Sequence, residues 1–155
     1  MQPSSLSIHT CLWFDSQAEE AAQFYVSLFD DARIERVHRN RDGSALFVEF
    51  ELLGQAYSAL NGGPRYELSP ATSLFVSCET QQEIDTLWDR LLRGGGTELK
   101  CGWVTDRFGL SWQIVPKCLG ELMADSDTQR ATRVMKALLQ MVKLDIASLE
   151  AAHAG

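Results

Sequence analysis

The sequence predicts an α+β fold made of two βαβββ modules followed by C-terminal helices. A strand–helix–strand pattern occurs twice along the 155 residues, and a Gly/Pro-containing linker at 61–66 separates the two copies. We expect the first module at about 6–61, the second at about 71–116 and the helices at about 118–153. Because the length suits a single core, we expect 1–155 to form one domain.

Each predicted helix begins with an S/T-x-x-E sequence. In a capping box of this form, the hydroxyl and the carboxylate satisfy backbone N–H groups of the first helical turn. Ser16 and Glu19 occupy these positions in the first module. Thr80 and Glu83 occupy them in the second, where the glycines at 94–96 end the helix. Apolar residues follow both boxes at helical spacing, so the repeat predicts two amphipathic helices.

Runs rich in β-branched and aromatic residues lie around the two helices and predict strands. Asp42-Gly43 and Gly54 are typical of hairpin turns in the first module, as is 106–109 in the second. The predicted strands are 6–14, 32–38, 45–52 and 55–60 in the first module, and 71–78, 97–101, 102–106 and 110–115 in the second.

From about Asp127 the chain takes on a helical pattern. Apolar residues at helical spacing continue to Leu149, with a break near 143–145. The apolar stripe of a terminal helix is buried either against its own domain or against a second subunit. We favour the second subunit and therefore expect a homodimer.

The composition is that of a globular protein, with 45% hydrophobic and 23% charged residues. The net charge of −7 repels nucleic-acid phosphates. We interpret Arg36, Arg39 and Arg41 as a solvated strand edge and turn, because Glu35 and Asp42 flank them. No apolar run approaches the roughly 18 residues of a membrane span, and no targeting segment is visible at the N-terminus. We therefore expect a cytoplasmic protein without nucleic-acid or membrane partners.

The four cysteines are widely spaced and include no C-x-x-C pair. We expect reduced, buried thiols rather than disulfides or a structural zinc site. Cys11 lies two residues from His9 on a predicted strand, so a nucleophilic Cys–His pair is an alternative. A strand cysteine is more commonly a small apolar residue.

Long segments of the chain resemble the PhnB-like family, also named 3-demethylubiquinone-9 3-methyltransferase. This family is a branch of the vicinal-oxygen-chelate superfamily, which includes glyoxalase I, extradiol dioxygenases and bleomycin-resistance proteins. The resemblance implies two βαβββ modules that form a curved sheet with a cavity for a small molecule. The resembling segments are CLWFDSQAEEAAQFYVSLF (11–29), FELLGQAYSALNGGP (50–64), SLFVSCETQQEID (73–85), CGWVTDRFGLSWQIVP (101–116) and RVMKALLQMVKLDIASLE (133–150).

Metal-dependent members of the superfamily bind one divalent ion through ligands from the first, fourth, fifth and last strands. At these places the chain offers His9, then Ala59 or Asn61, then Ser73, and finally Gln113. One imidazole and a neutral amide do not neutralise a divalent cation as a tripod of imidazoles and carboxylates does. We therefore expect no metal cofactor; if a divalent metal binds, His9 and Gln113 hold it. A lone His is more commonly hydrogen-bonded locally or partly exposed.

The methyltransferase name implies a site for S-adenosylmethionine. The commonest methyltransferase fold binds this cofactor with a Gly-rich turn that follows a strand and opens a helix. Here Gly62-Gly63 precedes a proline, and 94–96 follows a helix. The sequence therefore shows no site for this cofactor, and methyl transfer stays a second alternative that rests on the family name.

Strand alternation predicts that aromatic and neutral polar residues share one face of the sheet. Aromatic walls with a few hydrogen-bonding groups suit a small-ligand pocket, although the same residues can simply fill the concave sheet. We expect recognition of a small aromatic or amphipathic metabolite, with a metal-dependent lyase, isomerase or dioxygenase of the glyoxalase type as the alternative. No catalytic residue is assigned, and no function is assigned to His38 or His153. The candidate cavity residues are His9, Cys11, Trp13, Tyr57, Asn61, Ser73, Phe75, Ser77, Trp103, Ser111 and Gln113.

Overall fold

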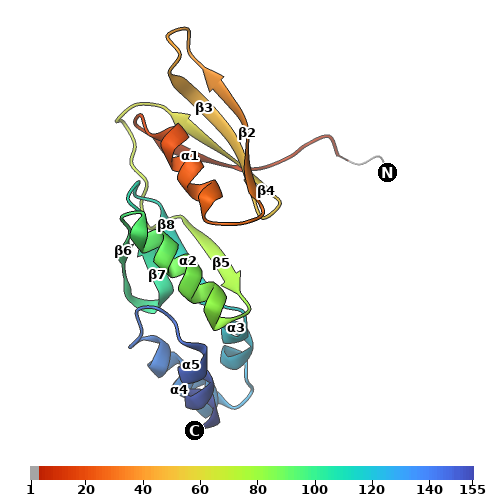
Figure 1. The fold of residues 1–155 in the computed structure, drawn as a ribbon. Helices are drawn as coiled ribbons and strands as arrows, with labels where there is room; N and C mark the ends of the chain where they lie inside the picture. The colour runs from red at the N-terminus through yellow and green to blue at the C-terminus, as the bar shows by residue number, and fades with distance from the viewer. Residues whose placement is uncertain (1–3) are drawn as a thin grey trace. The chain divides into compact units, whose positions relative to one another are not determined.

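A computed structural model describes residues 4–155 of the chain, which forms two compact units. Of the described residues, 4–68 form unit 1 and 69–155 form unit 2. Each unit contains a four-stranded sheet with a helix packed against it, and unit 2 also contains the C-terminal helices (Figure 1). The predicted α+β fold of two βαβββ modules with C-terminal helices is confirmed.

The sheet of unit 1 has the strand order β1-β4-β3-β2. Strands β1 and β4 are parallel, whereas the other neighbours are antiparallel. The charged strand β2 is therefore an edge strand, which agrees with the predicted solvated edge. The elements of unit 1 are β1 (Thr10–Phe14), α1 (Ala18–Ser27), β2 (Ala32–Arg39), β3 (Ala45–Leu52) and β4 (Gln55–Asn61).

Helix α1 packs its small apolar side chains and Tyr25 onto one face of this sheet. The ring of Tyr25 lies 6.2 Å from that of Phe50, and Phe50 stacks on Tyr57 at 5.5 Å. Alternation along the strands delivers every second side chain to this core. Its buried members include Leu12, Phe14, Ala18, Ala21, Ala22, Tyr25, Val48, Phe50, Leu52 and Ala59.

The N-terminus of α1 is capped by a side chain from a distant strand. The prediction of a Ser16–Glu19 capping box is wrong, because the N-cap is Gln17 and no side chain of the helix's own N-terminus caps it. Instead, the backbone N–H of Ala18 donates to Asn61 Oδ1 at 2.8 Å. The carboxylate of Glu19 pairs with Arg39 at 2.7 Å, so it is not available to fold back onto the N-cap.

The sheet of unit 2 repeats the topology of unit 1, with the order β5-β8-β7-β6. Strands β5 and β8 are parallel, and β8, β7 and β6 are antiparallel neighbours. The strand predicted at 97–101 is shorter than expected, because the chain turns through a 3-10 helix in which Cys101 has a positive φ of 62°. The elements are β5 (Ser73–Cys78), α2 (Gln81–Arg93), β6 (Thr97–Glu98), the 3-10 helix η1 (Lys100–Gly102), β7 (Trp103–Thr105) and β8 (Ser111–Pro116).

Helix α2 begins with the predicted capping box. The backbone N–H of Glu83 donates to Thr80 Oγ1 at 3.1 Å, and the carboxylate of Glu83 accepts from the Thr80 N–H at 3.3 Å. The helix ends at Arg93 before the predicted glycines, and Gly95 has a φ of 97°. Both predicted boundaries of this helix are therefore confirmed.

Three helices follow the sheet of unit 2: α3 (Cys118–Met123), α4 (Thr128–Leu138) and α5 (Ile146–Ala154). Asp127 and Asp145 cap α4 and α5 through their carboxylates, so the predicted break before Ile146 is confirmed. Within residues 4–155, no helix is both long enough and apolar enough to span a bilayer.

The cysteines are free thiols with different environments. Cys78 is buried, and burial raises the pKa of its thiol to about 11. The expectation of a buried thiol is confirmed for Cys78 and is wrong for Cys11, which is exposed because it lies on the sheet face opposite α1.

Candidate functional site

In each unit the helix covers one face of the sheet, and we call the opposite face the open face. Strand pairing assigns residues to it, because directly paired residues point to the same side and consecutive residues alternate. The open face of unit 1 comprises Cys11, Trp13, Arg33, Arg36, His38, Phe47, Glu49, Glu51, Ala56, Ser58 and Leu60. The open face of unit 2 comprises Ser73, Phe75, Ser77, Thr97, Trp103, Thr105, Ser111, Gln113 and Val115.

The six predicted cavity residues of unit 2 share its open face. Ser73 pairs directly with Ser111 across β5 and β8. Gln113 pairs with Phe75 on one side and with Trp103 on the other, so these three side chains form a row across three strands. Ser77 lies on the same face, two residues beyond Phe75. Ser111 is only 1% exposed, whereas Phe75 is 58% exposed.

In unit 1 the strand register places the predicted cavity residues of β1 and those of β4 on opposite faces of the sheet. Cys11 and Trp13 lie on the open face, but Tyr57 and Asn61 lie on the face that α1 covers. The reason is the register: Ser58, not Tyr57, pairs with Cys11, and Leu60, not Asn61, pairs with Trp13. A shift of one residue exchanges the two faces of a strand.

Trp13 is held by the linker that follows β4. Its indole N–H donates to the carbonyl oxygen of Gly63 at 2.9 Å, and its ring meets that of Tyr66 edge-on at 5.0 Å. Gly62 lies so close to the ring that a Cβ at that position would overlap it. These contacts restrain the orientation of Trp13.

His9 immediately precedes β1 and contacts the open face of unit 1. Its Nε2 atom lies 3.2 Å from the hydroxyl of Ser58, a side chain with 0% exposure. His9 is thus hydrogen-bonded locally, and its side chain is not paired with Cys11 in the described hydrogen bonds.

Gln113 and Ser73 make the equivalent contact in unit 2. The amide nitrogen of Gln113 donates to the hydroxyl oxygen of Ser73 at 3.0 Å. In both units the contact is diagonal across two parallel strands. Ser73 pairs directly with Ser111, and Gln113 is two residues beyond Ser111. If the β1–β4 register is extended by one residue, His9 lies opposite Ala56, and Ser58 is two residues beyond Ala56. His9 therefore corresponds to Ser73, and Ser58 to Gln113.

These four residues do not fit a divalent metal site of the kind that the superfamily uses. We predicted Ala59 or Asn61 at the metal-ligand position of the fourth strand, but the observed register places Ser58 there. The set then contains one imidazole, two hydroxyls and one amide, with no carboxylate to neutralise the cation. Within residues 4–155, no group of three or more His, Cys, Asp or Glu side chains is placed to hold a metal ion.

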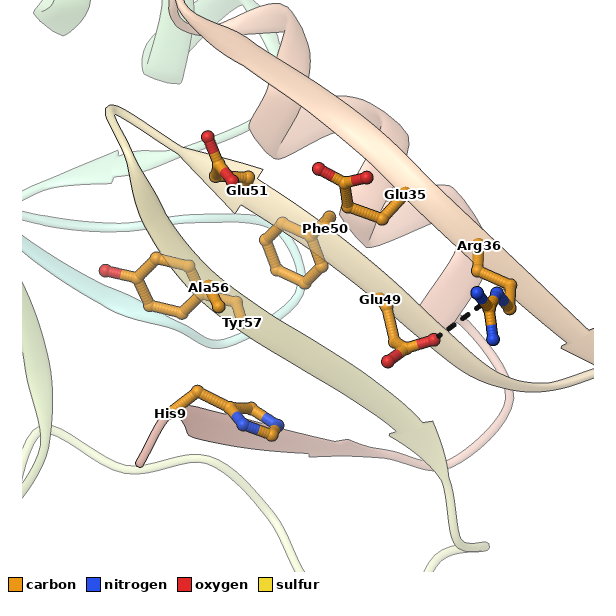
Figure 2. Close-up of a pocket in the computed structure, with 8 residues that line it drawn as sticks. All are labelled: His9, Glu35, Arg36, Glu49, Phe50, Glu51, Ala56 and Tyr57. Carbon is orange, nitrogen blue, oxygen red and sulfur yellow. Dashed lines mark ion pairs between the residues drawn. The ribbon is translucent and has the colours of Figure 1, made fainter. Parts of the chain in front are cut away.

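A pocket of about 320 Å³ lies in unit 1 beside His9 (Figure 2). Of its charged groups, Glu49 lies 3.9 Å from Arg36 and also 2.8 Å from His38, which is outside the lining. The hydrogen bond from His38 is the largest influence that holds the pKa of Glu49 below its usual range. The lining residues are His9, Glu35, Arg36, Glu49, Phe50, Glu51, Ala56 and Tyr57.

The sequence prediction did not identify Glu49, Glu51 and Ser58 as residues of this region. The alternation of charged and apolar residues in β3 contained the signal, because Glu49 and Glu51 alternate with the buried Val48, Phe50 and Leu52. For Ser58, the sequence holds no signal that fixes the register of β4 against β1.

The chain matches a protein family described as 3-demethylubiquinone-9 3-methyltransferase over residues 6–115. It is also similar to the solved structure of the PhnB protein from Bacillus cereus, which carries the same description. The two are 33% identical, with a TM-score of 0.66, over 72% of this chain and 99% of that one. No curated protein matches the chain.

More distant solved structures share the fold alone. A glyoxalase/bleomycin resistance protein from Albidiferax ferrireducens is 12% identical with a TM-score of 0.52, over 70% of this chain and 96% of that one. The fosfomycin resistance protein FosX from Listeria monocytogenes is 13% identical with a TM-score of 0.55, over 73% of this chain and 94% of that one. These likenesses extend the fold to proteins of several activities.

Proposed function

Since this chain belongs to the family named 3-demethylubiquinone-9 3-methyltransferase, we propose that it binds a small aromatic or amphipathic metabolite without the metal site of its superfamily. The site is the open face of unit 2, centred on Ser73, Gln113 and Phe75. Methyl transfer, which the family name suggests, is an alternative that titration with S-adenosylmethionine tests directly.

The observation that carries the proposal is the side-chain composition of this face. It combines aromatic side chains, one of them the 58% exposed Phe75, with neutral hydrogen-bonding groups such as Gln113. Apolar area provides affinity, and a few polar groups orient the ligand.

Metal-independent binding is supported by the side chains at the four superfamily positions. His9 is hydrogen-bonded to Ser58, and Gln113 is hydrogen-bonded to Ser73. Without a carboxylate, such a set binds a divalent cation weakly. The rival function is a lyase, isomerase or dioxygenase of the glyoxalase type with a metal held by His9 and Gln113.

Elemental analysis separates these two functions. Protein purified without chelator and without an affinity tag is expected to contain far less than one Fe, Ni, Zn or Mn per chain. Near-stoichiometric metal that disappears in the His9→Ala variant would contradict the metal-free proposal and favour the rival.

A thermal-shift screen against small metabolites tests the binding itself. A ligand present at 100 times its dissociation constant stabilises the protein by about 2.7 kcal/mol. We expect at least one aromatic or amphipathic compound to raise the melting temperature in the presence of EDTA. A screen in which no compound of this size does so would favour a purely structural role for the face.

We also propose that the protein is a homodimer. Two large apolar side chains before β1, Leu6 and Ile8, are 88% and 98% exposed. On α4 and the segment that follows it, Met135, Leu139 and Val142 are exposed as well. Apolar side chains of this size are commonly covered in an interface. Sedimentation equilibrium is expected to give twice the chain mass, and a single-chain mass would contradict the dimer.

A further inference from the structure

Residues 138–146, which we call the strap, include the connection from α4 to α5 and bond to the 3-10 helix η1. The backbone N–H of Cys101 donates to the carbonyl oxygen of Met141 at 2.8 Å. The N–H of Gly102 donates to the carbonyl oxygen of Val142, also at 2.8 Å. The strap therefore satisfies two consecutive backbone donors of η1, as a neighbouring strand would do.

These bonds hold Cys101 in a conformation that residues other than glycine avoid. Its φ is 62° and its ψ is 34°, in the left-handed region, where the Cβ atom crowds the carbonyl oxygen that follows it. The side chain of Leu144, which is fully buried, packs against the next residue, Gly102, so closely that a Cβ there would lie 3.0 Å from Leu144 Cγ. An unfavourable backbone conformation persists where its surroundings enforce it, and here the strap supplies those contacts.

One side chain of α2 holds the other side of the strap. Gln81 Nε2 donates to the carbonyl oxygen of Leu144 at 3.0 Å, and Gln81 Oε1 accepts from the backbone N–H of Ile146 at 2.8 Å. The ion pair between Lys143 and Asp85 also joins the strap to α2, but its side chains are 38% and 45% exposed, so it contributes little. Gln81 is therefore the main polar link between α2 and the strap.

Trp103 follows η1 directly and begins β7. Its backbone N–H donates to the carbonyl oxygen of Lys100, and its carbonyl oxygen accepts from the N–H of Leu99 at 2.8 Å. The pairing of Trp103 with Gln113 places its side chain on the open face of unit 2. Because the backbone of Trp103 is bonded to both ends of this turn, the conformation of η1 decides where the indole ring lies.

We propose that the strap is a conformational device that fixes Trp103 on the open face. Gln81 holds the strap, the strap holds Cys101 in its left-handed conformation, and η1 then fixes the position of Trp103. When the strap is released, Cys101 relaxes to an extended conformation and the indole becomes mobile, while the sheet of unit 2 stays folded. Gln81 is thus a positioning residue that acts on Trp103 through the strap. This role does not depend on the proposed function and fails separately from it.

Hydrogen exchange of single amides, followed by NMR without any added ligand, tests the role of Gln81. The matched control is Gln82→Ala, because Gln82 is the next residue of α2, is exposed and makes no hydrogen bond to the strap among residues 4–155. Gln81→Ala is expected to speed the exchange of the Cys101 and Gly102 amides about tenfold, through local opening of the strap. The amides that pair β5 with β8 should change by less than about twofold, and Gln82→Ala should change neither set.

A fluorine label reports on the indole itself. In protein labelled with 5-fluorotryptophan, the signal of Trp103 is assigned by its loss in Trp103→Phe. We expect this signal to move in Gln81→Ala and to keep its wild-type position in Gln82→Ala. Gln81→Met, which keeps the length of the side chain and removes both hydrogen bonds, should behave as Gln81→Ala does. It also serves as the test variant if the alanine variant does not fold.

Three results would overturn the proposal. Unchanged exchange at Cys101 and Gly102 in Gln81→Met would show that the strap does not depend on Gln81. Faster exchange at these amides with an unchanged Trp103 signal would show that η1 does not position the indole. An equal increase in exchange throughout unit 2 would show that Gln81 stabilises the whole unit rather than the strap.

Discussion

The two open faces have the same strand topology and opposite chemistry. In unit 1 the strands β2 and β3 carry ion pairs such as Arg33–Glu51 and Arg36–Glu49. In unit 2 the corresponding face is uncharged and contains the buried hydroxyl of Ser111, which has no hydrogen-bond partner among residues 4–155. Ion pairs at a solvated edge satisfy one another, whereas the neutral face has hydrogen-bonding capacity left over. This difference is why we propose ligand binding on the open face of unit 2 rather than of unit 1.

The hairpin that presents Ser111 and Gln113 depends on one buried carboxylate. Asp106 accepts from the backbone N–H groups of Phe108 and Leu110 at 2.9 and 3.0 Å, and from the indole N–H of Trp112 at 2.9 Å. We expect Asp106→Ala to lower the free energy of unfolding by about 3–5 kcal/mol, because it leaves buried donors unpaired. Urea titration measures this loss.

Asp106→Asn is the control for this prediction, since its Oδ1 keeps part of the acceptor capacity. It is expected to lose less stability than Asp106→Ala. Equal losses of unfolding free energy in the two variants would show that packing, rather than hydrogen bonding, holds this hairpin in place.

Asn61 of unit 1 carries a structural amide, whereas the amide of Gln113 in unit 2 is the one that we propose binds a ligand. It accepts from Ala18 N–H at 2.8 Å and donates to the carbonyl of Ala45 at 2.9 Å. Asn61→Ala is therefore expected to cost about 1–2 kcal/mol in urea unfolding. Asn61→Asp keeps the cap of α1 and should recover about half of that loss. A larger effect of Asn61→Ala on ligand binding than on stability would contradict the helix-facing assignment.

Removing the hydroxyl group before each helix is expected to cost stability at α2 and very little at α1. Thr80→Ala removes the hydroxyl that caps α2 and is expected to cost about 1 kcal/mol. Ser16→Ala is expected to stay within about 0.5 kcal/mol of the wild type, because no capping bond from Ser16 exists. Thermal unfolding of both variants checks this prediction. An equal loss of stability in the two variants would indicate that Ser16 caps α1 after all, as the sequence predicted.

The smallest effect on stability is expected from a substitution on the open face of unit 1. Glu49→Gln removes a carboxylate whose pKa is lowered mainly by the hydrogen bond from His38. A lowered pKa means that the pairing stabilises the protein above the ordinary Glu value of 4.5 and is lost as the pH falls through the lowered value. The small difference between wild type and variant should thus disappear in acid and shrink in high salt. A difference that persists at low pH would contradict this origin.

The sequence predicted the fold well because its signals are local. Helical spacing, the Thr80–Glu83 box and the glycines at 94–96 each act within a few residues, and all are borne out. The Ser16–Glu19 box failed because a residue far along the chain, Asn61, reaches the helix start first. Local patterns do not contain such a contact.

The site was predicted unevenly for the same reason. In unit 2 the three strands of the open face agree with simple alternation, so residues such as Gln113 were placed correctly on it. In unit 1 the face of β4 depends on its register against β1, which placed Ser58 where Tyr57 was expected. The ion pairs of Glu49 join β3 to β2, so a pattern within one strand does not predict them either.

Metal-free binding to the open face of unit 2 is tested most directly by a chemical-shift titration of the EDTA-treated protein with an aromatic compound that the thermal-shift screen identifies. We predict that the largest shifts occur at the backbone amides of Ser73, Ser111 and Gln113 and at the side-chain amide of Gln113. The amides of Arg36 and Glu49 should stay unchanged. Shifts that appear only after a divalent metal is added, or that are largest at Arg36 and Glu49, would contradict it.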